Sequence, residues 1–415
     1  MKPLIFKNSA KLFALTFCSL IFFSLKFSST GMTQEMPTNL RVATFNVSME
    51  ALNYVEKKPS DTLTIKGNEL TDALHKNHLQ IRNIAEIIQR VNPDIILLNE
   101  FDRIDDSTSN IDFFINNYLG KSQHNQQTIN YPYFYQGAVN TGVKINSDLN
   151  QDGKSNQLPA DAHGFGHFIG HFGMVLLSKY PIDEKAIRTF QQFKWHDMPN
   201  ALKPINPETN QSWYTQETWQ ALRLSSKSHW DIPIKINDKI IHILASHPTP
   251  PVFDGLENRN GNRNHDEIRF WFDYINAEQG AYIYDDNHQK GPLKANRRFI
   301  IMGDQNASSV EGDAIMTKNS QGIVALLSSD KIQDSLPKSL GGQNHSNENS
   351  NGIHHTAHWG MRADYVLPST MGFIIKKSGV FWPQQNEKTY RLIKNRQASS
   401  DHRLVWVDVE LIPMK

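Results

Sequence analysis

Polar residues able to do chemistry stand at the ends of several short apolar runs in this sequence. The run 299–302 leads through Gly303 into an acid and, two residues later, an amide. A single strand that ends this way is ordinary turn chemistry. Here the pattern recurs, at Asn46, Glu100, His247, Asp304, Asn306, Asp364, Asp401 and His402. Because a sheet can bring strand ends together on one rim, we expect these side chains to form one site.

Carboxylate, amide and imidazole groups in this combination suit the hydrolysis of phosphoesters. That reaction requires a positioned water molecule and compensation of the charge on the phosphoryl oxygens. A hard divalent cation, held by carboxylate and amide oxygens, can supply the compensation. An imidazole oriented by a carboxylate can serve as the general base.

The elements that would position these residues can be read from the local patterns. Short β-rich segments bounded by turn residues predict strands at 39–47, 94–100, 173–182, 238–247, 297–304, 363–368 and 402–411. Apolar residues at helical spacing predict helices at 78–91 and 262–275. Strands mixed with helices over the whole length favour one large α/β domain over a string of modules. The polar stretch 341–352 predicts a loop.

The first residues have the pattern of a secretory signal. Lys2, Lys7 and Lys11 precede the apolar run 12–25, and no acid occurs before Glu35. We therefore expect residues 1–31 to be a signal peptide and the protein to be exported, either to a periplasm or as a secreted protein. The alternative is an uncleaved membrane anchor, although the run is shorter than the roughly 20 residues that a spanning helix needs. After processing we expect no stable membrane span.

Composition narrows the class of partner. The only cysteine, Cys18, lies in the predicted signal, so the processed chain has no disulfide. Removal of residues 1–31 takes away four of the 43 basic residues and none of the 42 acidic ones, which leaves a formal charge of −3. A protein that binds long nucleic acid through many phosphates normally has a basic surface. Nucleic acid is therefore not the favoured partner.

The order of these residues resembles that of a known family. Asn46, Glu100, His247, Asp304 with Asn306, Asp364 and the run Ser400, Asp401, His402 follow one another as in the endonuclease/exonuclease/phosphatase superfamily, whose fold is that of pancreatic deoxyribonuclease. The similarity covers about residues 39 to 411, and the segments NRNGNRNHDEIRFWFDY and HTAHWGMRADYVLPS resemble exported bacterial members. The resemblance implies a four-layer α-β-β-α sandwich of two packed mixed sheets. Residues 32–415 would form a single catalytic domain, with loop insertions near 140–171 and 338–358.

The resemblance also implies a cofactor. Glu100 would be the main ligand of a divalent cation, with Asn46 beside it and Asp401 as a further oxygen or a neighbouring contact. Mg²⁺ or Mn²⁺ is expected, with Ca²⁺ as the alternative.

For catalysis, the resemblance implies that His402 activates the attacking water and that Asp364 orients its ring. Asp304 and Asn306 would hold the water and a phosphoryl oxygen, and His247 would donate to the phosphate. An exchange of the base role between His402 and Asp304 stays open.

The expected function is that of an exported, metal-dependent phosphoesterase that acts on phosphate mono- or diesters of a small molecule or a headgroup. Two alternatives stay open. One is a secreted non-specific nuclease that scavenges phosphate, and the other is a non-catalytic, calcium-stabilised binding protein on the same fold.

A separate segment suggests a structural calcium site. Oxygen donors at alternate residues followed by Gly153 resemble the first half of an EF-hand loop. The candidate ligands are Asp148, Asn150, Asp152, the carbonyl of Lys154, and Asp161. The twelfth position is Pro159 rather than glutamate, so a true EF-hand is excluded, and a solvated turn is the alternative.

Five further residues are candidates for binding the rest of the substrate. Arg259, Arg263 and Asn264 lie at the start of a predicted helix, where basic and amide groups favour an anion, although ordinary capping is the alternative. His171 belongs to the glycine-rich stretch 163–173, which we expect to line the site. His358 follows the polar loop, and its alternative is a solvated position.

Overall fold

Two mixed β-sheets packed face to face form the centre of the fold. The computed structural model describes residues 38–55, 64–104, 107–316, 318 and 321–414. The first sheet has the order β10 (Phe373–Val380), β11 (Val405–Leu411), β1 (Thr38–Met49), β2 (Ile95–Phe101), β4 (Met174–Ser178) and β3 (Tyr133–Tyr135). The second has the order β5 (Arg188–Thr189), β6 (His229–Ile236), β7 (Lys239–Ser246), β8 (Arg298–Asp304) and β9 (Asp364–Pro368). The pairs β1–β2 and β7–β8 are parallel, and the other pairs are antiparallel.

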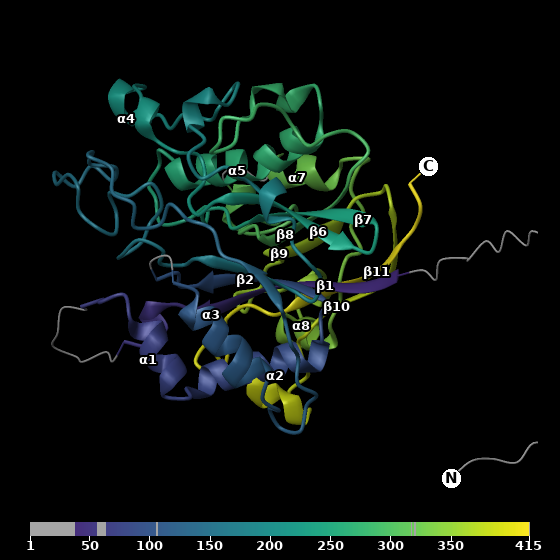
Figure 1. Ribbon diagram of the computed structural model, residues 1–415. Coiled ribbons are helices and arrows are strands. Elements are labelled where there is room, and N and C mark those ends of the chain that lie inside the picture. The colour runs from purple at the N-terminus through teal and green to yellow at the C-terminus, as the bar shows by residue number, and fades with distance from the viewer. Residues whose placement is uncertain (1–37, 56–63, 105–106, 317, 319–320, 415) are drawn as a thin grey trace, which may run out of the picture. The chain divides into compact units, whose positions relative to one another are not determined.

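Helices cover the outer face of each sheet. On the first sheet lie α1 (Glu69–His75), α2 (Leu79–Val91) and α3 (Ser109–Phe114), and on the second lie α5 (Arg259–Ile275) and α7 (Gln321–Leu327) (Figure 1). The shorter helices are α4 (Gln216–Ala221), α6 (Asp313–Met316) and α8 (Leu340–His345). The remaining helical elements of the described residues are one π-helix, η2 (Ile115–Leu119), and short 3₁₀ helices: η1 (Ala51–Asn53), η3 (Glu184–Ala186), η4 (Trp195–Asp197), η5 (Gln279–Tyr282), η6 (Gly352–His354) and η7 (Lys388–Leu392). The expected α-β-β-α sandwich is confirmed.

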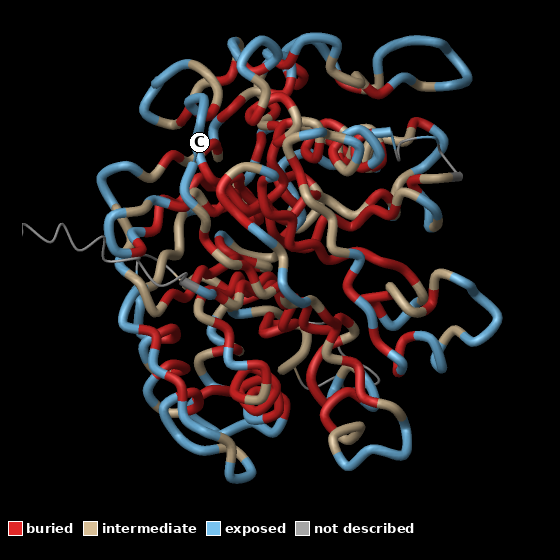
Figure 2. Tube along the Cα trace, turned by 90° about the vertical axis from the view of Figure 1, so that its right-hand side faces the viewer, coloured by how far each residue is buried: buried red, intermediate tan, exposed pale blue. Residues whose placement is uncertain are grey.

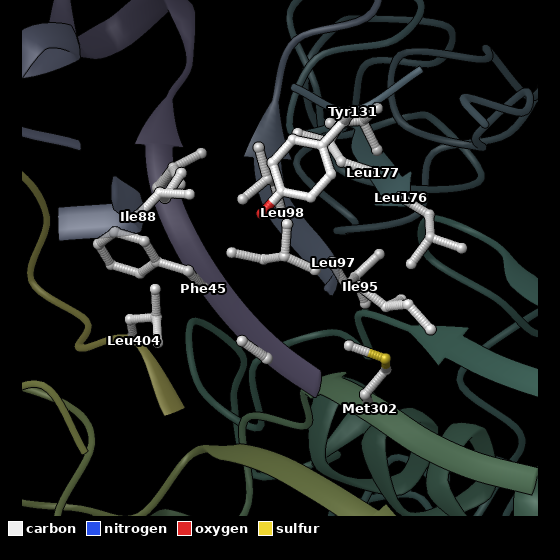
Figure 3. Packing of buried hydrophobic residues seen from close by; sticks show 14 of the residues in the cluster. Phe45, Ile88, Ile95, Leu97, Leu98, Tyr131, Leu176, Leu177, Met302 and Leu404 are labelled. Atoms are coloured by element: carbon white, nitrogen blue, oxygen red, sulfur yellow. The ribbon is translucent and has the colours of Figure 1, made fainter. Parts of the chain in front are cut away.

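The two cores follow from the apolar patterns of the strands and helices. Phe45 of β1, Leu97 of β2, Ile88 of α2 and Met302 of β8 belong to one buried cluster, which fills the space between the sheets and beneath α2 (Figure 3). A second cluster joins α5 and α7 to the outer face of the second sheet. Buried residues run through the central strands, and exposed residues lie mainly on peripheral loops (Figure 2). Truncating a fully buried aromatic in such a core costs about 3–5 kcal/mol.

Helix α2 shows how local sequence places an element. Its isoleucines, which recur at helical spacing, are buried along one face. His78 caps the start, because its side chain accepts from the backbone N–H of Gln80. Asn92 ends the helix in the left-handed conformation with φ of 51°.

The predicted strands correspond to β1, β2, β4, β7, β8, β9 and β11, and the predicted helix 262–275 begins earlier, at Arg259. Strands β3, β5, β6 and β10 were not predicted. The prediction of a loop across 341–352 is wrong at its ends, where α8 and η6 form. Helix α8 starts there because the Ser339 side chain accepts from the backbone N–H of Gly342.

The predicted signal, residues 1–31, lies outside the described residues. Within the part of the chain that the structure describes, no helix has the length and apolar character of a membrane span. The predicted insertion 140–171 is mostly irregular, with isolated bridges such as Thr141 to Gly164.

Candidate active site

The sheet topology brings the predicted residues to one edge of the sandwich. Strands β7 and β8 are parallel, so the residues that follow them, His247 and Asn306, leave the sheet on the same side as Asp304. Strand β9 is antiparallel to β8, and its first residue, Asp364, pairs in register with Asp304. Acids 60 residues apart in sequence therefore lie side by side because of the register of one ladder.

Hydrogen bonds join the first sheet to the second at this edge. Asn46 and Asn99 are register partners on β1 and β2. The Asn46 amide donates to Asp304 Oδ2 (3.1 Å), and Asn99 Oδ1 accepts from the backbone N–H of Asp304 (3.2 Å). Strand β1 has an irregular register between Asn46 and Met49, as often occurs beside active sites.

Asp304, Asp364 and His402 form the centre of the site. His402 Nδ1 lies 2.9 Å from Asp364 Oδ2, and His402 Nε2 lies 3.5 Å from Asp304 Oδ2. A metal ion could be held by three or more His, Cys, Asp or Glu side chains whose ligand atoms lie close together. Among the described residues, this is the one such group in which these atoms all lie within 4.8 Å of one another. All three are buried, and the Trp359 ring stands nearly perpendicular to His402 at 4.9 Å.

Two further predicted residues surround Asp304. His247 Nε2 lies 3.4 Å from Asp304 Oδ2. The backbone N–H of Asn306 donates to Asp304 Oδ1 (2.9 Å), and its side chain donates to the Pro248 carbonyl (3.1 Å). His247 Nδ1 is buried and, within the described part of the chain, has no hydrogen-bond partner. One oxygen of Asp304 thus faces an amide and two imidazoles.

These contacts set the charges of the site. Burial opposes the charged form of His402, but Asp364 and Asp304 outweigh it and raise the pKa of His402 to about 10. Burial, and then the charge of Asp364, raise the pKa of Asp304, while His402 and Asn46 counteract them. Burial lowers the pKa of His247 well below its usual value, and Lys227 and His402 add to this effect, so this ring is neutral at pH 7.

Glu100 has the features of a cation ligand. It is half-buried at the end of β2 with φ of +56°, a left-handed conformation that is unfavourable for a glutamate and is typical of functional sites. Burial raises its pKa, Arg396 lowers it, and Glu50 and Asp401 raise it further. No described residue donates a hydrogen bond to its carboxylate or forms an ion pair with it. Glu100 follows Asn99, which is the register partner of Asn46 on the neighbouring strand. A carboxylate and an amide are oxygen donors of the kind that Mg²⁺, Mn²⁺ and Ca²⁺ prefer, so these residues fit a divalent cation.

Asp401 has a protein partner. Arg396 donates to Asp401 Oδ2 (2.8 Å), and Ser48 donates to Asp401 Oδ1 (3.2 Å). Burial opposes ionisation of Asp401, but His402 and Arg396 outweigh it and lower its pKa. The position favours the role of a neighbouring contact over that of a direct metal ligand.

Sequence reasoning missed several residues that hold this site. Arg396 also pairs with the buried Glu50 (3.2 Å). Thr356 donates to Asp364 Oδ2 (2.7 Å) and accepts the backbone N–H groups of Ala363 and Asp364 (2.9 and 3.0 Å). A lone threonine or arginine in an irregular segment gives no periodic signal, so only its spatial partners identify it.

His171 is part of a buried pair. Its ring is fully buried, its Nδ1 accepts from the backbone N–H of His167 (3.2 Å), and its Nε2 lies 3.2 Å from Glu50 Oε2. Burial lowers the pKa of His171 to about 4. This geometry supports a role in holding Glu50 and does not add support for contact with a substrate.

The predicted phosphate-binding residues of α5 bind protein groups. Asn264 donates to the carbonyls of Thr249 and Gln305 (2.8 and 2.9 Å). Arg263 donates to the carbonyls of Leu224 (2.8 Å), Arg223 (3.0 Å) and His163. Both side chains hold loops at the edge of the site. Arg259 pairs with Glu257, and the exposed His358 ring lies 4.6 Å from His345.

The candidate calcium loop is closed by its own backbone. Asp148 accepts the N–H groups of Asp152 and Gly153 (3.1 and 2.8 Å). Asp161 accepts those of Leu149 and Gln157 (2.8 and 2.9 Å). Lys154 donates its N–H to Asp152, and the Asn150 amide donates to the same carboxylate. The calcium site stays a prediction.

The chain is similar to several solved structures but to no curated protein. Among solved structures, an endonuclease/exonuclease/phosphatase from Beutenbergia cavernae is 15% identical with a TM-score of 0.49, and covers 90% of this chain and 72% of its own. The human Nocturnin catalytic domain with bound sulfate is 14% identical with a TM-score of 0.45, and covers 90% of this chain and 95% of its own. Beta toxin from Staphylococcus aureus is 14% identical with a TM-score of 0.40, and covers 89% and 99%.

A family model decides the classification. The model of the endonuclease/exonuclease/phosphatase family matches residues 43–402, a segment that begins in β1 and ends at His402. It therefore includes every residue of the site described above. The chain belongs to the endonuclease/exonuclease/phosphatase family and is a metal-dependent phosphoric ester hydrolase.

Proposed function

We propose that this protein is an exported phosphoesterase that uses a divalent cation, Mg²⁺ or Mn²⁺ before Ca²⁺, to hydrolyse small phosphate mono- or diesters. The observation that carries the proposal is the convergence of His402, Asn46 and His247 on one carboxylate oxygen of Asp304. Export is inferred from the three lysines that precede the apolar run 12–25.

In the proposed mechanism, His402 accepts the proton of the attacking water. Asp364 holds its ring through Nδ1, which leaves Nε2 directed toward Asp304. Asp304 and Asn306 hold the water and a phosphoryl oxygen, and His247 donates to the phosphate. Although burial opposes the charged form, Asp364 and Asp304 raise the pKa of His402 to about 10, so the ring holds a proton at neutral pH and must lose it before it can act as the base.

The chemistry of the cofactor enters at Glu100. A divalent cation beside Glu100 and Asn46 would compensate the phosphoryl oxygens and, by its charge, lower the pKa of His402 toward neutrality. Asp304 lies 3.5 Å from His402 Nε2 and is the alternative base.

The near-neutral surface favours a small ester over long DNA, because the processed chain has a formal charge of −3. A plasmid-nicking assay across salt concentrations tests this choice. Efficient nicking that falls steeply with salt would support the nuclease alternative, whereas a small-ester hydrolase leaves plasmid largely intact.

Hydrolysis of bis(p-nitrophenyl) phosphate and p-nitrophenyl phosphate tests the activity itself. We expect turnover with Mg²⁺ or Mn²⁺, loss with EDTA, and recovery when the metal is restored. The His402→Ala variant should lower kcat by about 10²–10⁴-fold, the usual contribution of a general base. His75→Ala, on the exposed side of α1, is the control. A folded wild-type protein that turns over neither ester with any of the metals would contradict the proposed choice of substrate.

A further inference from the structure

A lysine that no motif singled out lies beside the site. Strand β6 is antiparallel to β7, with His229 opposite Ser246. The residues just before β6 therefore lie at the same sheet edge as His247, which just follows β7. Ser226 confirms this placement, because its hydroxyl donates to the His247 carbonyl (3.3 Å). Lys227 thus lies beside the site, just before a strand that runs opposite to the strands that lead to His247 and Asp304.

The backbone around Lys227 is fixed on both sides. The Lys227 carbonyl accepts the backbone N–H of Asn140 (2.8 Å). The N–H of Ser226 donates to the buried carboxylate of Glu267 on α5 (2.5 Å), whose other oxygen accepts the N–H of Thr249 (2.7 Å). Glu267 therefore ties the segment that carries Lys227 to the segment that follows His247.

The side chain of Lys227, by contrast, has no partner among the residues that the structure describes. The residue is 7% exposed. No described residue forms an ion pair or a hydrogen bond with its ammonium group. A buried, unpaired charge is costly, and lysines are seldom buried without a partner. The nearest ordinary explanation, an ion pair with Glu267, does not hold, because that carboxylate binds two backbone amides instead.

The charges that act on Lys227 come from residues of the site. Burial lowers its pKa, and Glu267, Glu100 and Asp304 counteract this effect. In turn, Lys227 contributes to the lowered pKa of both His247 and His171. These charges act on Lys227 from the edge of the sandwich to which Ser226 joins the His247 segment, so they agree with the placement of Lys227 beside the site.

We infer that Lys227 is a substrate-binding residue, whose ammonium group donates a hydrogen bond to a non-bridging oxygen of the substrate's phosphate. The inference rests on the proposed function, since it adds an anion-binding group to that same site. An ammonium group is a compact charge with three donors, which suits a phosphoryl oxygen. A phosphate would supply the partner that the described residues do not. His247 is neutral and donates from one nitrogen only, so Lys227 adds the positive charge that His247 lacks.

Binding of inorganic phosphate in the presence of Mg²⁺, measured by calorimetry, tests the inference without turnover. We expect Lys227→Met to weaken phosphate binding about tenfold to hundredfold, which is the range for one charge-assisted hydrogen bond. Lys227→Arg, which keeps the charge, should bind with intermediate affinity. Lys235→Met is the matched control on β6, since Lys235 is exposed and pairs with Asp183; it should bind phosphate as the wild type does.

Thermal unfolding separates binding from a structural role. If Lys227 serves the ligand, Lys227→Met should unfold at the same temperature as the wild type or higher without phosphate, and should gain less from added phosphate. If the variant is destabilised without phosphate and keeps the wild-type phosphate affinity, the inference is wrong.

The outcome is distinct from that of the proposed function. A wild type that binds phosphate through Lys227 but cleaves no ester would contradict only the function. A wild type that cleaves esters while Lys227→Met binds phosphate normally would contradict only the inference. Absence of phosphate binding to the wild type would overturn the inference.

Discussion

Glu100 shows how much one side chain can contribute to this site. Its backbone is held at φ of +56°, and its carboxylate has no partner among the described residues. Both features cost free energy in the protein alone, because a left-handed glutamate is strained and an unpaired half-buried carboxylate loses hydration. A bound cation would offset the second cost, which is why we treat Glu100 as the principal ligand.

The variant Glu100→Gln tests this role at the residue scale. The amide keeps the shape of the side chain but removes the charge, so we expect the Mg²⁺ concentration for half-maximal activity to rise at least about tenfold. A metal titration of ester hydrolysis measures it, and Glu184→Gln in the exposed turn η3 is the control. An unchanged metal requirement would exclude Glu100 as a ligand.

Helix α5 is the element that holds the loops around the site. On one buried face, Arg263, Asn264 and Glu267 bind backbone groups of four separate segments. Buried backbone groups need partners, and irregular segments cannot supply them from their own ladders. The polar residues of α5 therefore replace the missing strand hydrogen bonds and keep the loops in one conformation.

At the element scale, Glu267→Gln should lower the free energy of unfolding by about 1–3 kcal/mol. The amide nitrogen would face one of the two backbone N–H groups that the carboxylate now accepts, and an unsatisfied buried donor costs that much. Urea denaturation measures the change, with Glu217→Gln on the exposed face of α4 as the control. Equal stability of variant and wild type would show that the loops do not depend on this carboxylate.

At the scale of the whole molecule, the buried histidines make the fold sensitive to acid. His229, at the start of β6, is 1% exposed; its Nε2 donates to the Glu267 carbonyl (2.8 Å), and its Nδ1 lies 2.5 Å from Ser225 Oγ. The rings of Phe270 and Trp271 pack against it. Burial lowers the pKa of His229 to about 4, although the Glu267 carbonyl opposes this effect.

The sign of the pH dependence follows from linkage. The unfolded chain binds a proton on this residue near its ordinary pKa of about 6.5, whereas the folded protein does not. Stability is therefore retained above about pH 6.5 and lost as the pH falls toward 4, by up to about 1.4 kcal/mol per pH unit for this residue. Urea denaturation at pH 7.5, 6 and 5 should show a flatter dependence for His229→Gln than for the wild type. Identical slopes would contradict the assignment.

Much of the fold could be predicted because its signals are local. The isoleucines of α2 and the apolar run of β8 are periodic within a single element, and each was found. Strand β6 was missed although Trp230, Ile232, Ile234 and Ile236 alternate along it, because Pro233 interrupts the run and argues against a central strand. Because β6 was not predicted, the position of Lys227 beside the site was not predicted either.

The sequence alone determined which residue types occur and in what order, and this was enough for the family, the sheets and most of the central cluster. Only the tertiary structure decided the protein partners: Asp401 pairs with Arg396, Asp364 with Thr356, and Arg263 and Asn264 with backbone carbonyls. The physical reason is the distance along the chain over which each kind of interaction acts. Backbone periodicity is set by neighbours a few residues away, whereas the partner of a polar side chain depends on the register and packing of segments that are distant in the chain.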